Sequence, residues 1–276
     1  KNISRLDFKK FLILRKKKLN TLMISITPRN ILFYFLLNLF FNNLKNFVYL
    51  RSDGYKEYKT KFGELGKYCF ALMVKILGKK IKIISVSKNI TSPKIDYLIT
   101  PSELNKYWFK KKKKLKINFP RLLYFGRFKK EKGIFSLIDL LDNQKFKYQL
   151  TIAGDKNYPS LNNKKIKFIN EFSKQQKIIN LYDNHNIFIL PSYTEGAPKV
   201  ILESLARKKP VIVFKDIKHV KNNFKGIFVC ERNIINLKNL FHHILRNYSK
   251  IQKNMNKNIL ITKNEFQKRL LDILYA

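Results

Sequence analysis

The sequence predicts an α/β protein with two parallel sheets, one in each half of the chain. Short β-branched or aromatic runs alternate with helical patterns along the 276 residues, and such alternation is typical of parallel strands covered by helices. The strand candidates are apolar along nearly their whole length, as in sheets buried on both faces. A dense lysine run, Lys110 to Lys114, separates the halves. We therefore predict two domains, the first one short or truncated.

The first half, which we assign to residues 1–117, shows four strand candidates. They cover residues 21–27, 47–51, 81–87 and 96–101, with helices at 31–41 and 56–78 and a short helix capped by Ser102. The apolar run 31–41 is too short to span a bilayer. The chain opens KNISRLDFKKF, without an initiator Met or a signal-peptide pattern. This leaves open whether residue 1 is a true start.

The second half, residues 118–260, looks complete. Its six strand candidates cover residues 121–127, 147–154, 165–170, 186–192, 210–214 and 226–230, and helices are expected at 133–143, 173–183 and 198–208. Two or three more helices run to the end. We expect the terminal helix, residues 261–276, to pack back toward the first domain.

The composition combines a large core with a strong positive charge. Hydrophobic residues make up 45% of the chain, and 58 Lys+Arg against 18 Asp+Glu give a net charge of +40. This charge indicates an anionic partner such as nucleic acid, a membrane surface or a phosphorylated substrate. Abundant Lys, Asn, Ile and Phe are equally typical of genomes poor in G and C. Both readings stay open.

Metal and thiol chemistry are disfavoured. The four histidines show no metal-ligand spacing, and no Asp-x-Asp pair exists to hold a metal diphosphate. The two cysteines, Cys69 and Cys230, lie far apart in apolar contexts, so we expect buried, reduced thiols. We predict no metal and no cofactor.

One candidate anion site lies in RLLYFGRFKKEKGIFSLIDLL. The strand ends at Gly126, and Arg127 and Lys132 flank a short loop before Gly133 opens a helix. In open parallel sheets, ligands bind beyond the carboxyl ends of strands, near helix N-termini. A guanidinium and an ammonium there can hold a diphosphate without a metal. In so basic a chain, a solvated loop is the alternative.

A second candidate site lies in PSYTEGAPKVILESLARKKPVIV. Glu195, Gly196 and Ala197 occupy the loop after a strand, Pro198 falls at the first helical turn, and Glu203 follows about a turn and a half later. The loop amides suit an anion, and the two carboxylates can accept hydrogen bonds from sugar hydroxyls. From spacing alone, a solvated helical glutamate and a loop acid that offsets the helix dipole remain the alternative.

Together these segments resemble the donor half of family 4 of the GT-B glycosyltransferases, the retaining group 1 type. The resemblance is carried, over about residues 120–260, by FGRFKKEKG (125–133), TIAGD (151–155), NIFILPSYTEGAPKVILESLARKKPVIV (186–213) and GIFVC (226–230). The two glutamates match that family's Glu-x7-Glu signature. The resemblance implies the GT-B architecture, in which two Rossmann-like domains have parallel sheets facing a cleft.

The resemblance also implies roles for single residues. Arg127 and Lys132 would hold the diphosphate of a UDP- or GDP-sugar and stabilise the leaving group. Glu195 would contact hydroxyls of the donor sugar, and Glu203 those of the ribose. Gly126 and Gly133 border the diphosphate loop, and amides of the region Gly196, Ala197 and Pro198 would approach the sugar or phosphate, although Pro198 itself has no N–H.

The first half matches this family only weakly. TPRN (27–30), VYLRSDG (48–54) and ITPSEL (99–104) fall where an acceptor-binding half would place them. The early glycine-rich loop is absent, and Arg51 and Asp53 stand where the family often has a histidine. Asp53 is an acceptor-site candidate, but an ordinary Asp-Gly turn is the commoner explanation.

The predicted function is metal-independent, retaining hexosyl transfer to a lipid-linked or surface-polysaccharide acceptor of the lipopolysaccharide or capsule type. We expect a bacterial cytoplasmic enzyme at the inner face of the plasma membrane, where its basic surface contacts anionic lipid. One alternative is a basic nucleic-acid-binding protein. Its lysines are dispersed and no nucleic-acid-binding motif appears, so no nucleic acid is expected. The other is an inactive, truncated or phosphorylase-like GT-B relative.

Overall fold

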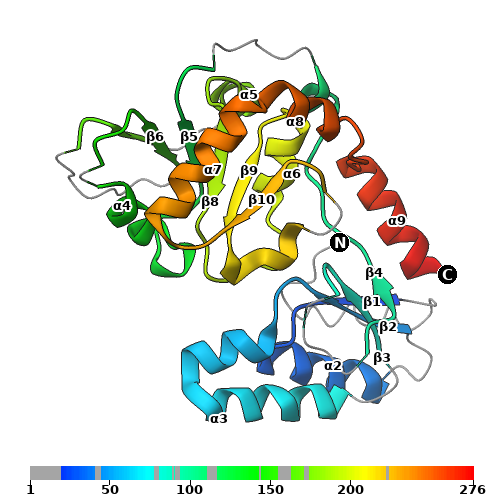
Figure 1. Ribbon diagram of the computed structural model, residues 1–276. Helices are drawn as coiled ribbons and strands as arrows, with labels where there is room; N and C mark the ends of the chain where they lie inside the picture. The colour runs from blue at the N-terminus through cyan, green and yellow to red at the C-terminus, as the bar shows by residue number, and fades with distance from the viewer. Residues whose placement is uncertain are drawn as a thin grey trace. The chain divides into compact units, whose positions relative to one another are not determined.

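The computed structural model describes residues 20–40, 45–77, 81–88, 90, 94–110, 117–142, 144–154, 163–170, 174–221 and 224–276. The chain forms two compact units, Lys1–Pro101 with Glu265–Ala276 and Ser102–Asn264 (Figure 1). The first contains a four-stranded sheet and the second a six-stranded sheet, and neighbouring strands in both run parallel. The predicted α/β class with two parallel sheets is confirmed. Most of the lysine run, residues 111–114, lies outside the described residues.

The first sheet has the order β1-β2-β3-β4. Its unit comprises β1 (Asn20–Ile24), α2 (Pro28–Phe40), β2 (Lys45–Leu50), α3 (Gly54–Leu77), β3 (Ile81–Ser85), β4 (Tyr97–Leu98) and most of α9 (Lys263–Tyr275). The central strand β2 is buried from Asn46 to Leu50. Because successive strands are neighbours and parallel, right-handed crossovers place α2 and α3 on the same face of the sheet.

Asp53 and Gly54 lie at the start of α3. The Asp53 carboxylate accepts a hydrogen bond from the Lys56 backbone N–H at 3.3 Å, which satisfies a donor of the first helical turn. A Cβ at Gly54 would lie 2.1 Å from the Phe70 ring, so glycine lets that buried ring pack there. Arg51, just before this turn, is exposed.

The short helix predicted after Ser102 begins later than expected. The structure has a 3₁₀ helix, η1 (Lys106–Phe109), whose N-cap is Asn105. The predicted Ser102 cap is wrong, because Asn105 Oδ1 accepts the Tyr107 N–H of the helix at 3.1 Å. Ser102 Oγ accepts the Leu104 N–H at 3.2 Å, and the hydroxyl donates to the Ile261 carbonyl at 2.7 Å. This hydroxyl therefore fixes the chain before η1 to the segment before α9.

The second sheet has the order β10-β9-β8-β5-β6-β7. Its strands are β5 (Arg121–Phe125), β6 (Gln149–Ala153), β7 (Ile166–Ile169), β8 (Ile187–Leu190), β9 (Val211–Phe214) and β10 (Ile227–Cys230). Its helices are η2 (Lys130–Lys132), α4 (Ile134–Leu141), α5 (Gln175–Asp183), α6 (Lys199–Ala206), η3 (Lys215–Lys221), α7 (Ile234–Arg246) and α8 (Tyr248–Met255). All residues of β8 and β9 are buried, and α7 lies across the front of this sheet in Figure 1.

The strand order reverses between β5 and β8, which pair through Leu122–Ile187 and Leu123–Phe188. The chain winds from β5 toward β7, returns to β8, and then winds the other way toward β10. Right-handed crossovers therefore put α4 on one face and α6 on the other. The chain segments after β5 and β8 lead to helices on opposite faces at this topological switch point, where open α/β sheets bind ligands.

The two cysteines differ in environment. Cys230 is buried as predicted, and burial raises the pKa of its thiol to about 11. Cys69 is exposed on α3, so the prediction of a buried thiol there is wrong. Several apolar side chains of α3 are exposed with it. Among the described residues, no helix is both long enough and apolar enough to cross a membrane.

Candidate functional site

The two sequence-predicted loops meet at the switch point of the second sheet. The Lys132 ammonium, at the end of η2, lies 2.7 Å from Glu195 Oε1 in the loop after β8. The Lys132 side chain is 21% exposed and that of Glu195 12% exposed. A charged pair so withdrawn from water is weakly screened. The structure thus places a predicted diphosphate ligand beside the predicted sugar ligand.

Two further residues fix Glu195. The Ser192 hydroxyl donates to the same Oε1 atom at 2.7 Å, and His219 Nε2 lies 2.8 Å from the Glu195 backbone carbonyl, to which it donates as the Nε2–H tautomer. Ser192 follows β8 and is fully buried, whereas His219 comes from η3. Sequence reasoning missed both residues, because nothing in a lone serine or histidine marks a partner in a distant loop.

Gly133 lets the two loops approach closely. Its φ is +64°, and a Cβ at this position would lie 1.9 Å from the Pro191 carbonyl oxygen. The Tyr193 N–H also donates to the Glu131 carbonyl at 3.1 Å. Backbone contacts therefore join the loop after β8 directly to η2, which carries Lys132.

Gly126 and Arg127 lie at the carboxyl end of β5. The Gly126 N–H donates to the Ala153 carbonyl at 2.9 Å, and the Tyr124 hydroxyl donates to the Arg127 carbonyl at 2.7 Å. The Arg127 side chain is exposed. The backbone of Arg127 is therefore fixed while its guanidinium faces solvent. Asp155 of the TIAGD segment lies outside the described residues.

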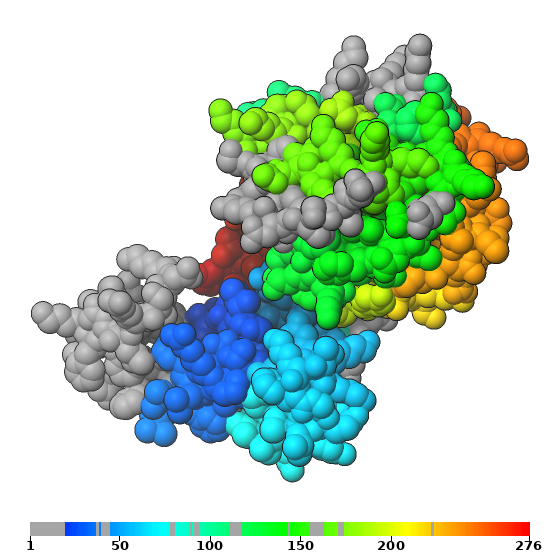
Figure 2. Space-filling view, turned by 90° about the vertical axis from the view of Figure 1, so that its left-hand side faces the viewer, coloured from blue at the N-terminus to red at the C-terminus, as the bar shows by residue number. Residues whose placement is uncertain are grey.

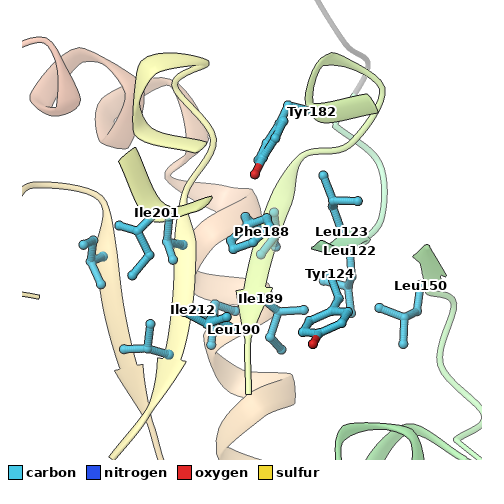
Figure 3. Close-up of a cluster of buried hydrophobic side chains, with 14 of the residues drawn as sticks. Leu122, Leu123, Tyr124, Leu150, Tyr182, Phe188, Ile189, Leu190, Ile201 and Ile212 are labelled. Carbon is cyan, nitrogen blue, oxygen red and sulfur yellow. The ribbon is translucent and has the colours of Figure 1, made fainter. Parts of the chain in front are cut away.

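Glu203 lies on α6 and binds a different partner. The Tyr182 hydroxyl, from α5, donates to Glu203 Oε2 at 2.8 Å. Burial raises the pKa of Glu203, although the Tyr182 hydrogen bond and Lys199 act in the opposite direction. The Tyr182 ring stacks on Phe188 with centroids 5.6 Å apart, and Figure 3 shows it at one edge of the buried cluster. The core thus positions this carboxylate, through a tyrosine that sequence reasoning missed.

Gly196, Ala197 and Pro198 are partly buried in the loop that leads to α6. Pro198 has φ −71° and ψ 116° and is the N-cap, so the helix begins at Lys199. The prediction that Pro198 occupies the first helical turn is therefore wrong by one residue. Proline suits the observed place as well, because its fixed φ matches that of the cap.

Within the described part of the chain, no group of three His, Cys, Asp or Glu side chains gathers as a metal site would require. The structure joins Lys132 to Glu195, while Tyr182 holds Glu203 separately and Tyr124 holds the backbone of Arg127. Arg51 and Asp53 belong to the other compact unit.

Comparison with known proteins shows the family of this chain. Residues 107–260 match the family model described as glycosyl transferases group 1, which is more than half of the chain. The chain belongs to this family, as the sequence resemblance predicted. A relative in Bacillus subtilis (strain 168), TuaC, is named as a teichuronic acid biosynthesis glycosyltransferase and is 31% identical over 90 residues. That alignment covers 33% of this chain but only 23% of the relative.

Solved structures show the same fold at low identity. The sucrose-phosphate synthase of Thermosynechococcus elongatus is 16% identical with a TM-score of 0.74, over 98% of this chain and 76% of that one. Anabaena Alr3699/HepE, solved with UDP-glucose, is 13% identical with a TM-score of 0.71, over 97% and 81%. The predicted GT-B fold is confirmed by these likenesses.

Proposed function

We propose that this protein transfers a sugar from a UDP- or GDP-sugar to a lipid-linked or surface-polysaccharide acceptor, with retention and without a metal. The observation that carries the proposal is the Lys132–Glu195 pair at the switch point of the second sheet. Membership of the glycosyl transferases group 1 family supports sugar transfer. The teichuronic acid biosynthesis for which TuaC is named supports the acceptor class, and the UDP-glucose complex of HepE supports the donor class.

In this proposal, the chemistry depends on stabilising the leaving group. The bond between the anomeric carbon and the phosphate oxygen breaks, and its electron pair leaves with the nucleoside diphosphate. An acceptor hydroxyl oxygen forms the new bond to the anomeric carbon, and its proton passes to the departing diphosphate. Arg127 and Lys132 are cations that would stabilise this developing charge. Glu195 would position the sugar through its hydroxyls. A retained configuration follows from the family resemblance alone.

Glu195 has a second role before the donor binds, when it acts as the counter-ion of Lys132. An incoming diphosphate competes with the Glu195 carboxylate for the ammonium, while the sugar hydroxyls offer that carboxylate new donors. Binding of the donor therefore separates the pair, because Lys132 turns to the diphosphate while Glu195 turns to the sugar hydroxyls. This exchange explains why an acid can lie inside a site for an anion.

The ribose contact of Glu203 gives the test of the proposed function. We expect UDP to bind the protein roughly tenfold more tightly than 2′-deoxy-UDP, because a hydroxyl bonded to a carboxylate contributes about 1.5–3 kcal/mol. Glu203→Gln should weaken UDP binding and remove most of this preference. Calorimetric titration of both nucleotides, repeated with GDP and its 2′-deoxy form, measures this preference for the ribonucleotide.

The matched control is Glu57→Gln, which removes an exposed carboxylate from α3. It should leave both affinities unchanged. Equal affinity of the wild-type protein for ribo- and deoxynucleotide would contradict the assignment of Glu203. Failure to bind UDP or GDP, together with tight salt-sensitive DNA binding, would favour the nucleic-acid alternative. Nucleotide binding without sugar transfer to any acceptor would favour the inactive-relative alternative.

We further propose that α3 docks on an anionic membrane from the cytoplasmic side. The second half of α3 exposes an apolar stripe, here called the α3 stripe: Leu65, Tyr68, Cys69, Leu72 and Ile76. These positions repeat at helical spacing. Exposed lysines such as Lys67 and Lys75 accompany the stripe. An apolar helical face beside lysines fits the boundary of an anionic bilayer.

The neighbouring helix α2 adds exposed apolar side chains at Leu32, Phe35, Leu36 and Leu39. The two helices contact each other and adjoin in Figure 2, where α2 is blue and α3 is light blue to cyan. Exposed apolar area of this extent marks an interaction surface rather than an ordinary solvated one. An anionic membrane is the partner that also accounts for the net charge of +40.

Cys69 allows a direct test of docking. Its thiol is exposed, while burial holds the pKa of Cys230 near 11, so an environment-sensitive fluorophore should attach at Cys69 alone. We expect the emission of this fluorophore to shift to the blue with phosphatidylglycerol vesicles and to shift little with phosphatidylcholine vesicles. Leu65→Gln with Leu72→Gln should abolish the shift.

Vesicle sedimentation alone would not test this proposal, because a chain of net charge +40 binds anionic lipid through its charge. The control is Ile259→Gln, which changes an apolar residue that is 87% exposed in the other unit. It should leave the blue shift intact. Binding to phosphatidylglycerol without a blue shift would contradict insertion of the α3 stripe.

A further inference from the structure

Arg232 lies two residues beyond the carboxyl end of β10 and joins several segments of the candidate site. Its side chain is 19% exposed. The guanidinium donates to the Pro191 carbonyl at 3.0 Å and to Asp216 Oδ2 at 2.7 Å. A weaker bond of 3.4 Å reaches the Ser136 hydroxyl on α4. These contacts connect β10 with the end of β8, with η3 and with α4.

Two aromatic rings also hold the guanidinium. Its central carbon lies 4.2 Å from the centroid of the Tyr193 ring and 4.4 Å from that of the Phe214 ring. Cation–π contacts at these distances favour a planar, weakly hydrated guanidinium over an ammonium. Tyr193 lies two residues before Glu195. The orientation of the loop that carries Glu195 is thus coupled to Arg232.

The carbonyl that Arg232 binds is the one that approaches Gly133. A Cβ at Gly133 would lie 1.9 Å from the Pro191 oxygen and 3.3 Å from an Arg232 terminal nitrogen. Arg232 therefore contacts the place where the Lys132 loop and the Glu195 loop meet. Three of its five N–H donors bind Pro191, Asp216 and Ser136, which suits a residue that holds the site rather than one that binds the ligand.

We propose that Arg232 is a positioning residue of the donor site, which holds the loop after β8 against η2 and so fixes Lys132 in place. This inference rests on the proposed function. If it is correct, Arg232 affects nucleotide binding through Lys132. Its loss should then matter little once Lys132 has been removed.

A double-mutant cycle with UDP as the calorimetric probe tests this proposal. Arg232→Met should weaken UDP binding at least tenfold, and Arg232→Lys should weaken it nearly as much, because an ammonium cannot form the planar fork. In a Lys132→Met background, the same changes should weaken binding less than threefold. Arg246→Met, which alters an exposed arginine on α7, should leave the affinity unchanged.

Two outcomes would overturn the proposal. One is UDP affinity within twofold of wild type in Arg232→Met, and the other is an equal loss with and without Lys132. Hydrogen exchange supplies a readout without ligand: the Tyr193 amide, which donates to Glu131, should exchange at least tenfold faster in Arg232→Met. If wild type binds neither UDP nor GDP, the proposed function fails, and unchanged Tyr193 exchange would still overturn the role of Arg232 independently.

Discussion

Replacing Arg207 with methionine is expected to lower the free energy of unfolding by about 3–5 kcal/mol, as the loss of one partner of a buried ion pair does. Arg207 follows α6 and is 1% exposed. Its guanidinium binds both carboxylate oxygens of Asp183, at 2.9 and 2.6 Å. It also donates to the carbonyls of Trp108 and Lys110. Methionine would leave the Asp183 carboxylate buried without this cation.

This prediction extends to the candidate site, because consecutive residues of α5 hold two residues of the α6 region. Tyr182 binds Glu203, and Asp183 binds Arg207. Trp108 packs edge-to-face on Tyr182, with centroids 5.6 Å apart. Loss of the Arg207 contacts should therefore also loosen Glu203, and UDP affinity should fall with stability.

Chemical denaturation measures the effect on stability. The control, Arg246→Met, should change the unfolding free energy by less than about 0.5 kcal/mol, as surface substitutions usually do. Arg207→Met combined with Asp183→Leu should recover part of the loss, because no unpaired charge then remains. A loss below about 1 kcal/mol for the single variant would contradict the buried-pair account, since typical losses are several times larger.

Gly133→Ala is expected to have the second large effect. Its φ of +64° disfavours any side chain, and the new Cβ would lie 1.9 Å from the Pro191 oxygen. The backbone conformation costs roughly 1–2 kcal/mol for an L-residue, and the clash adds to this by separating the two loops. We expect a stability loss beyond that range and at least a tenfold loss of UDP affinity.

Gly63 provides a control for a positive φ without a close contact, since its φ is +65° and nothing lies within 4 Å of its Cβ position. Its ψ of −156°, against 13° at Gly133, puts it in a region that essentially only glycine adopts, so its own backbone cost is the larger one. Gly63→Ala should therefore show the backbone cost alone, with unchanged UDP binding. UDP affinity of Gly133→Ala within twofold of wild type would mean that the close approach to Pro191 is relieved easily. That result would contradict the requirement for glycine where the loops meet.

Much of the fold could be predicted because its strands are buried on both faces. Such strands read as continuous apolar runs, and every strand of the second sheet falls inside a predicted range. The start of helices was less predictable: Asn105 rather than Ser102 caps η1, and Pro198 is a cap rather than a helical residue. The prediction that Cys69 is buried was wrong because α3 is apolar over more of its surface than the sheet covers.

The candidate site was predictable where residues follow strand ends in a recognisable spacing. Lys132 and Glu195 belong to that pattern, and the structure brings them to 2.7 Å. Tyr182, Ser192, His219 and Arg232 could not be found in this way. Each acts through a contact that the chain's linear order does not reveal, and the strand order decides which elements meet.

The central claim is that Lys132 and Glu195 form the diphosphate and sugar sides of one donor site. Calorimetric titration of UDP into wild type, Lys132→Met and Glu195→Gln tests it most directly. Lys132→Met should weaken binding roughly 10- to 100-fold, as loss of a charge-assisted hydrogen bond does. Glu195→Gln should strengthen UDP binding severalfold, because the competing carboxylate is gone. Opposite shifts are the predicted result, and unchanged affinity in both variants, or weaker binding in both, would contradict it.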